Sequence, residues 1–336
     1  MKEEKTASVS VRELLAKEPE PVSWVVEDLI PTGLGLIIGP SKLGKSWMAL
    51  QLALAVASGK EFLGFHSRKG NVLYLALEDN ERRLVERVGH IQKGEEVPEG
   101  FRVRFVSSRL PKLIEELEEE RRASDPKLVI IDTLQMIRGP VRNTENLYAY
   151  DYREMAMLKK FADENDIAII AIHHTRKAND TSNVFNNISG TTGIMGAADS
   201  SFVLSKDKEK VVLSVTGRDI SSEEYLLSFD KDTCLWSMEE TREAEMERRL
   251  LESFESSSVV RVLRNAELPY KATASEIQQE IKDKEGACLS LYEVSGSIQK
   301  YERLLHERLH IIHHTERTSS KRLHVFERKE ESIDGR

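Results

Sequence analysis

The chain has 336 residues, 40% hydrophobic and 32% charged, a composition typical of a globular protein with one large domain and a smaller one. No apolar run is long enough to span a membrane, the first residues carry no secretory signal, and the two cysteines are not spaced for zinc, so we expect a cytoplasmic protein. The net charge of −8 argues against one broad basic face for nucleic acid but leaves room for a localised groove or pore.

From residue 33 to about residue 235, apolar β-rich runs alternate with longer amphipathic stretches. This alternation predicts an α/β fold with a mostly parallel sheet and crossover helices. The apolar runs are continuous, which is typical of strands buried on both faces. We expect strands over residues 34–39, 71–78, 101–108, 127–134 and 167–175. Helices are expected over residues 45–58, directly after Asp79, over 111–123 and over 150–166.

The part after residue 175 has a different character. A polar loop, RKANDTSNVFNNISG, comes first, and its length predicts either a functional or a disordered segment. Two strands joined by the charged turn KDKE, with two shorter strands after them, predict an antiparallel extension of the sheet. Residues 238–250 are dense in Glu and Arg and predict a helical linker. Three helices and a terminal hairpin then predict a small α+β domain of the winged helix-turn-helix kind.

The stretch GPSKLGKSW contains the pattern G-x-x-x-x-G-K-S of a phosphate-binding loop, between a predicted strand and a predicted helix. Gly39 and Gly44 let backbone amides approach phosphate oxygens closely. Lys45 supplies a positive charge for the β and γ phosphates, and Ser46 offers its hydroxyl to Mg²⁺. We expect the nucleotide to be bound by the whole stretch, namely Gly39, Pro40, Ser41, Lys42, Leu43, Gly44, Lys45, Ser46 and Trp47.

Two carboxylates stand at predicted strand ends. Asp132 closes the run LVIID, where it is a candidate second anchor for Mg²⁺. The next residue is Thr133, so the glutamate that follows this aspartate in AAA+ proteins is missing and the water-activating base must come from elsewhere. Glu78 is the candidate base, because the carboxyl ends of parallel strands share one edge. In the alternative interpretation, Glu78 and Asp79 only start the next helix, with Asp79 as its cap.

Five segments together, GPSKLGKSW, VLYLALEDNERRLVERV, LVIIDTLQ, AIIAIHHTRK and SGTTGIMGAADSSFVL, resemble the RecA-like ATPases of the RepA type. These are hexameric replicative helicases of mobile plasmids, and the DnaB helicases are more distantly similar. The resemblance covers about residues 22–235. It implies a RecA-like P-loop core, ATP and Mg²⁺ as cofactors, and a homo-hexameric ring that acts on single-stranded DNA. A replication initiator or primase is a further implied partner.

The resemblance also implies roles for residues in three other places. His173 and His174 end the fifth strand, where one of them would sense the γ phosphate, and a merely solvated histidine is the alternative. Arg218 follows a strand at the position from which ring helicases insert an arginine into the neighbouring subunit's site, and a solvated charge is the alternative. Arg176 and Lys177 begin the loop that this family presents to DNA, and disorder without DNA contact is the alternative.

The segment HERLH, residues 306–310, is a literal H-E-x-x-H zinc pattern. A metalloprotease needs both histidines on one helix face, whereas HIIHHTE directly afterwards already reads as a strand. We therefore interpret the segment as the end of a recognition-like helix that runs into a wing, and not as a metal site. The histidines concerned are His306, His310, His313 and His314. Whether this domain binds DNA, with Lys321 and Arg322 in the wing, or a protein partner stays open.

The sequence thus predicts an N-terminal extension, a RecA-like ATPase domain, a helical linker and a winged-helix-like domain. Their expected bounds are residues 1–22, 23–238, 239–251 and 252–330. The expected function is a Mg²⁺-dependent ATPase, a ring-forming DNA helicase in plasmid, phage or mobile-element replication. One alternative is a RecA-like regulatory or recombination ATPase that binds DNA without unwinding it. The other is a DNA-anchored adaptor with vestigial turnover.

Overall fold

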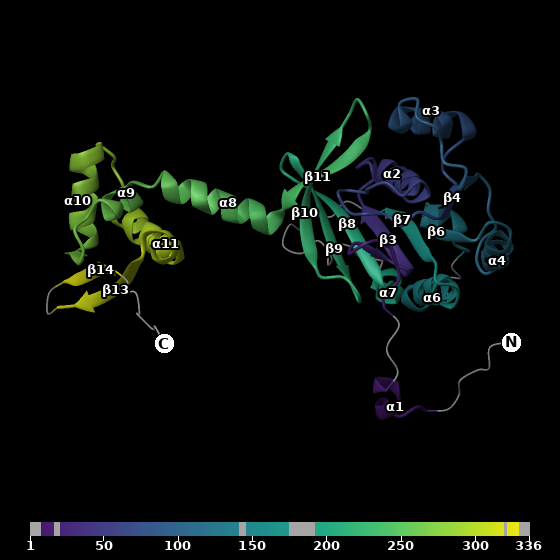
Figure 1. Ribbon diagram of the computed structural model, residues 1–336, viewed down its shortest axis with the longest axis horizontal. Helices are drawn as coiled ribbons and strands as arrows, with labels where there is room; N and C mark the ends of the chain where they lie inside the picture. Colours follow the sequence, from purple (N-terminus) through teal and green to yellow (C-terminus); the bar gives the residue numbers. More distant parts are fainter. Residues whose placement is uncertain (1–7, 17–20, 141–145, 175–191, 319–320, 329–336) are drawn as a thin grey trace. The chain divides into compact units, whose positions relative to one another are not determined.

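The computed structural model describes residues 8–16, 21–140, 146–174, 192–318 and 321–328. The chain divides into two compact units, residues 1–242 and 243–336 (Figure 1). Among the described residues, no helix is long and apolar enough to cross a bilayer.

The first unit is built on a nine-stranded sheet with the order β11, β10, β9, β8, β3, β7, β6, β4, β5. Six of its strands run parallel: β3 (Gly33–Gly39), β4 (Asn71–Ala76), β5 (Phe101–Arg104), β6 (Pro126–Asp132), β7 (Ala168–His174) and β8 (Ser200–Asp207). The other three continue the sheet as an antiparallel meander: β9 (Lys210–Gly217), β10 (Glu223–Asp230) and β11 (Leu235–Thr241). The predicted α/β class with a mostly parallel sheet and an antiparallel extension is confirmed.

Helices cover both faces of this sheet, and Figure 1 shows α2 and α6 on opposite sides of it. One face carries α2 (Lys45–Ser58) and α3 (Glu81–Gln92). The other carries α4 (Lys112–Ser124), α5 (Leu134–Ile137), α6 (Leu147–Asn165) and α7 (Thr192–Ala197). Neighbouring strand residues alternate between the two resulting cores, as Ile37 and Ile38 do, which explains why the strand sequences are continuously apolar.

The register of the parallel strands brings their carboxyl ends to one edge. Gly39 is paired with His174, and Ala76 is paired with Asp132. The strands end earlier than predicted, since β4 ends at Ala76 and β6 at Asp132, and Glu78 therefore lies in the turn after β4. This edge is where a nucleotide binds in open parallel sheets.

The segment predicted as a helical linker begins as a strand. Residues 238–241 belong to β11, because Leu226 and Tyr225 of β10 are paired with Glu240 and Thr241. The helix α8 starts only afterwards and spans Arg242–Glu255. Cross-strand pairing has overridden the helix propensity of a Glu-rich segment. Three short elements near the N-terminus were not predicted: α1 (Val11–Leu15), β1 (Trp24–Val26) and β2 (Ile30–Pro31).

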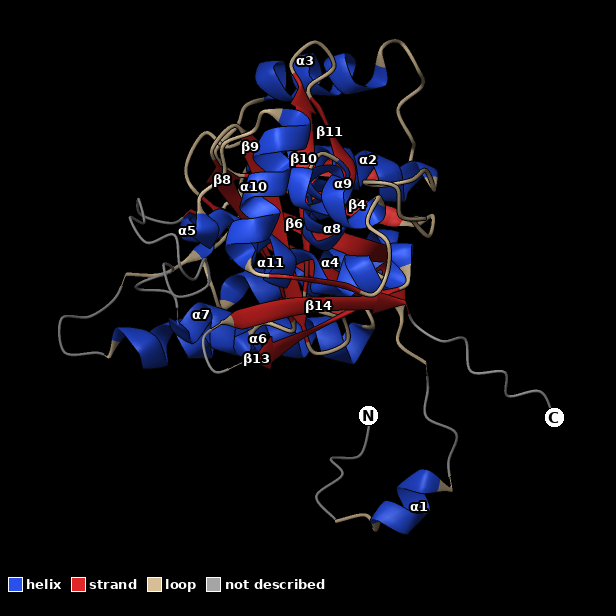
Figure 2. Cartoon of the chain, turned by 90° about the vertical axis from the view of Figure 1, so that its left-hand side faces the viewer, coloured by secondary structure: helices blue, strands red, loops and turns tan. Residues whose placement is uncertain are grey.

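The second unit has the element order of a winged helix. Its elements after α8 are α9 (Ser258–Arg264), β12 (Tyr270–Ala272), α10 (Ala274–Glu285), α11 (Leu291–Leu309), β13 (Ile311–Arg317) and β14 (Arg322–Arg328). Figure 2 shows β13 and β14 side by side, and β12 completes a three-stranded sheet. The three predicted helices and the hairpin are present, whereas β12 was missed. His310 ends α11 with φ 56°, so the segment HERLH does not place its two histidines on one helix face.

Candidate nucleotide site

The stretch from Gly39 to Trp47 contains the end of β3, the loop of residues 40–44 and the start of α2, as the phosphate-binding pattern requires. Gly44 has φ +88°, in the left-handed region, and a Cβ at this residue would lie 2.8 Å from the ring of Trp236. The side chain of Lys45 is buried, and its Nζ donates hydrogen bonds to the carbonyl oxygens of Gly39 and Pro40, each at 2.7 Å. Carbonyl groups at the start of the loop therefore hold the ammonium group of Lys45 in place.

Burial dominates the electrostatics of Lys45. It lowers the pKa of this amine to about 8, while the charges of Asp132 and Glu78 act in the opposite direction. A phosphate placed at the loop would add negative charge beside the amine. The geometry therefore favours an anionic ligand at this point.

Asp132 lies at the carboxyl end of β6, beside the loop, and is buried. The hydroxyl of Tyr74 donates to its Oδ2 at 2.8 Å. Burial raises the pKa of Asp132, and hydrogen bonds from Tyr74 and Ser46 act against that shift. The Ser46 hydroxyl and the Asp132 carboxylate are thus neighbours, and both are oxygen ligands of the kind that Mg²⁺ prefers. These residues fit a magnesium ion held next to the phosphates.

Tyr74 is a site residue that the sequence analysis missed. It is buried in β4, two residues before the end of the strand, so it faces the same side as Ala76. Burial raises the pKa of its hydroxyl well above the ordinary value, and Asp132 adds to this effect. A tyrosine inside an apolar strand run was the available signal, because a buried tyrosine hydroxyl usually has a hydrogen-bond partner.

Glu78 accepts one hydrogen bond and lies near one imidazole, from the segments at the ends of β6 and β7. The hydroxyl of Thr133 donates to Glu78 Oε1 at 2.7 Å, and His174 Nε2 lies 3.8 Å from Glu78 Oε2. Thr133 directly follows Asp132, at the position where AAA+ proteins have a glutamate. Here its buried hydroxyl orients the carboxylate that follows β4.

The two histidines at the end of β7 face different surroundings. Burial, with the charges of Arg138, His174 and Lys45, lowers the pKa of His173 to about 4. Arg138 is paired with Asp151 and Glu154 of α6, so His173 lies on the α6 side of the sheet. His174 lies near Glu78 and lines the cavity beside the loop. The strand alternation therefore brings His174 to the candidate site and leaves His173 outside it.

A cavity of about 750 Å³ adjoins the loop. One part of its wall is basic and includes Lys42 and Arg87, whose guanidinium lies 5.3 Å from the centre of the Trp47 ring. Another part comes from the antiparallel extension and carries apolar, polar and charged side chains. Its apolar members are Val211, Leu227, Phe229 and Trp236, and its charged members include Lys210 and Glu239. Sequence patterns did not predict that these distant strands would reach the loop.

Asp79 has a structural role. Its carboxylate is paired with Arg83 at 2.8 Å and with Arg87 at 2.7 Å. The cap of α3 is Asn80, whose side chain accepts from the amide of Arg83, so the alternative that Asp79 is the cap is wrong. The backbone of Asn80, with φ −131° and ψ 164°, has the extended conformation that an N-cap needs.

Arg218 lies far from its own loop. It directly follows β9, whose last residue, Gly217, is paired with Ser200 near the amino end of the parallel strands. Its amide donates to the carbonyl oxygen of Asp199 at 2.9 Å, and its guanidinium lies 3.4 Å from Asp199 Oδ1. Lys159 also donates to this carboxylate. Arg218 is therefore at the opposite edge of the sheet from Lys45.

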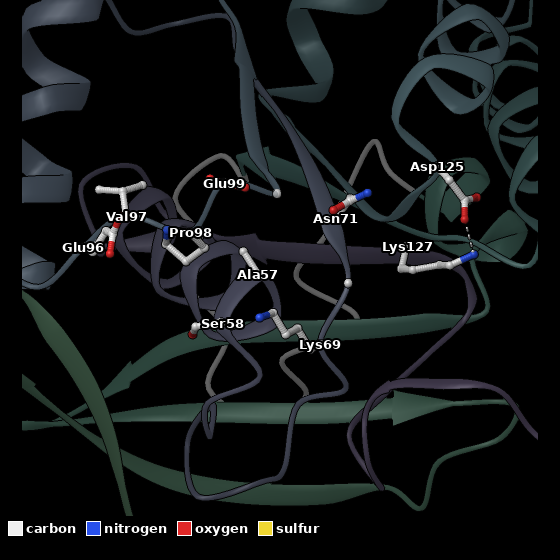
Figure 3. Close-up of a pocket in the computed structure, with 12 residues that line it drawn as sticks. Ala57, Ser58, Lys69, Asn71, Glu96, Val97, Pro98, Glu99, Asp125 and Lys127 are labelled. Carbon is white, nitrogen blue, oxygen red and sulfur yellow. Dashed lines mark ion pairs between the residues drawn. The ribbon is translucent and has the colours of Figure 1, made fainter.

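A second cavity, of about 720 Å³, lies at that opposite edge, at the amino ends of β4, β5 and β6 (Figure 3). Its walls carry charges of both signs, among them Lys127, which is paired with Asp125 at 3.0 Å. Ala57 and Ser58 at the carboxyl end of α2 also line it, and this end of a helix dipole repels anions. None of the predicted site residues that the structure describes lines this cavity. Arg176 and Lys177, the candidate DNA contacts, lie outside the described residues.

Comparisons with known proteins concern the family and the fold of this chain. A family model described as an AAA domain matches residues 2–180. The solved ATPase domain of G40-P is 16% identical to this chain, with a TM-score of 0.50 over 62% of this chain and 85% of that one. A DnaB-like replicative helicase, solved in a study of its interactions with primase, is 16% identical, with a TM-score of 0.47 over 61% of this chain and 57% of that one. The match to the ATPase domain confirms the predicted RecA-like fold.

The hydrogen bond between Tyr74 and Asp132 leads to a prediction about stability. Replacing Tyr74 with Phe removes the donor and leaves a buried carboxylate oxygen without this partner. We expect Tyr74→Phe to lower the free energy of unfolding by about 1–3 kcal/mol, measured by urea denaturation at neutral pH. Tyr292→Phe is the matched control, because Tyr292 is 87% exposed and its loss should change little. Equal unfolding midpoints for the two variants would contradict this account.

Proposed function

This chain belongs to the AAA domain family, and from that premise we propose that it is a Mg²⁺-dependent ATPase that works as a ring-forming DNA helicase on single-stranded DNA. One observation carries the ATPase part of the proposal. Lys45, Ser46, Glu78 and Asp132 come from three different segments of the chain and meet at one edge of the sheet. This is the set of groups that phosphoryl transfer to water requires.

The geometry supports a role for each of these groups. The loop amides and the Lys45 ammonium hold the phosphates, and Ser46 and Asp132 hold the magnesium ion. The ion supplies positive charge to the phosphate oxygens when it is bound. Glu78, oriented by Thr133, aligns the attacking water and accepts its proton. His174, 3.8 Å from Glu78, is the residue that senses the terminal phosphate, and His173 is not, because it lies on the other face.

The location of Arg218 supports the proposal that the chain assembles into a ring. It lies at the edge opposite its own loop, so it reaches a triphosphate only in a neighbouring copy packed head to tail. A planar cation there would neutralise charge that develops on the transferred group. Three further parts of the proposal rest on the motif resemblance to the RepA type. They are the hexameric state, the DNA contacts of Arg176 and Lys177, and a replication initiator or primase as partner.

The central test compares turnover with strand separation. We expect ATP hydrolysis that requires Mg²⁺, rises with single-stranded DNA, and drives displacement of a strand from a forked duplex. Glu78→Gln should keep nucleotide binding and lower turnover by about 10²-fold or more, since it removes the base. Glu81→Gln, a neighbouring change on the first turn of α3, is the control and should retain full turnover. Hydrolysis that rises with single-stranded DNA but displaces no strand would favour a regulatory ATPase. A complete lack of hydrolysis would exclude the helicase and the regulatory ATPase alike.

The pKa of Lys45 predicts how nucleotide binding depends on pH. In the chain alone burial holds this pKa at about 8, and bound phosphate raises it because it stabilises the ammonium form. Above that pH the free chain must take up a proton to bind, so we expect the affinity for ADP to fall by up to about tenfold per pH unit. Calorimetric titrations at about pH 7 and about pH 9.5 measure this effect. A constant affinity would show that Lys45 keeps its ordinary pKa.

Arg218 gives a test of assembly. Arg218→Ala should leave nucleotide binding intact and lower turnover by about 10³-fold, because each site lacks its neighbour's cation. Mixing Arg218→Ala with Lys45→Ala chains should restore part of the activity, since some interfaces then combine an intact loop with an intact arginine. Arg122→Ala, an exposed arginine on α4, is the control. Turnover that does not respond to mixing would exclude action between subunits.

A further inference from the structure

An indole from the antiparallel extension is hydrogen-bonded to the phosphate-binding loop. Trp236 of β11 is buried, and its Nε1 donates to the carbonyl oxygen of Gly44 at 3.2 Å. The ring lies against Gly44 so closely that a Cβ there would be 2.8 Å from Cζ2. Phe229 supports the indole from β10, with ring centroids 4.9 Å apart. The contact therefore joins segments 192 residues apart in the chain.

The backbone of β11 is tied to the same helix by a second contact. The side-chain amide of Gln51, about two turns into α2, donates to the carbonyl oxygen of Trp236 at 2.9 Å. Its Oε1 accepts from the amide of Trp236, also at 2.9 Å. This pair of bonds fixes the position of residue 236 relative to α2, and so fixes where the indole meets the loop.

The carbonyl of Gly44 matters because of the peptide plane to which it belongs. Across a trans peptide the C=O of one residue and the N–H of the next point in opposite directions. The Gly44 oxygen also accepts the first helical bond, from Met48, at 3.0 Å. With this oxygen held by two donors, the N–H of Lys45 is directed away from the helix, toward the side where a helix N-terminus receives an anion.

We propose that Trp236 is a positioning residue for phosphate binding, which orients the Gly44–Lys45 peptide so that its N–H group faces the phosphates. The inference rests on the proposed nucleotide-binding function and adds to it a residue outside every predicted motif. It also gives the antiparallel extension a direct mechanical connection to the loop.

The test uses Trp236→Phe, which keeps an aromatic ring and removes the N–H donor. We expect the KM for ATP and the dissociation constant for ADP to rise about fivefold, the effect of one misaligned hydrogen bond. The kcat should stay within about twofold, because Glu78 and Thr133 are untouched. A merely structural role would lower the melting temperature without this selective change in KM. Trp24→Phe, a partly buried tryptophan on β1, is the matched control.

Inorganic tripolyphosphate separates the loop from the adjoining cavity, since Trp236 lines that cavity as well. This probe has no base, so a loss of its inhibition by about fivefold in Trp236→Phe supports positioning of the phosphate contacts. Unchanged inhibition overturns the inference. If Trp236→Phe fails to fold, Gln51→Met takes its place, because it removes both hydrogen bonds to residue 236. We expect Gln51→Met to weaken the inhibition by tripolyphosphate as well. Unchanged inhibition of Gln51→Met by tripolyphosphate would also overturn the inference. Wild-type protein that binds neither nucleotide nor tripolyphosphate would refute the proposed function itself.

Discussion

A lysine buried beside two carboxylates is the interaction on which the candidate site depends. Burial of a cation costs free energy, and here two carbonyl oxygens of the loop and the charges of Asp132 and Glu78 offset this cost. The bonds from Lys45 to the carbonyl oxygens of Gly39 and Pro40 also hold the first residues of the loop beside the start of α2.

The topology of the sheet explains why these groups meet at all. Parallel strands place their carboxyl ends together, so the loop after β3, Glu78 after β4, Asp132 of β6 and His174 of β7 share one edge. The antiparallel strands bring in residues from much later in the chain, among them Trp236. The register of the strands, and not closeness in the sequence, thus determines which side chains lie beside the phosphate-binding loop.

Much of the fold followed from the sequence, since continuous apolar runs and turn signals define buried strands locally. The loop and the strand-end position of Asp132 were equally local. What sequence reasoning missed depends on long-range register: the bond from Tyr74 to Asp132, the bond from Thr133 to Glu78, and the end of β11 at Thr241. The choice between His173 and His174 required knowing which face of β7 each one takes, and a run that is apolar on both faces does not reveal this.

The carboxylate of Asp199 is shared by two cations, Lys159 and Arg218, and it also accepts from the amide of Leu34 at the foot of β3. Lys159 is the more sheltered of the two, with 24% of its side chain exposed against 59% for Arg218. If the guanidinium swings outward, the ammonium remains, and no bare negative charge is stranded in the protein interior. The ion pair of Arg218 can therefore open while Asp199 keeps a charged partner, Lys159, and its hydrogen bond from the amide of Leu34.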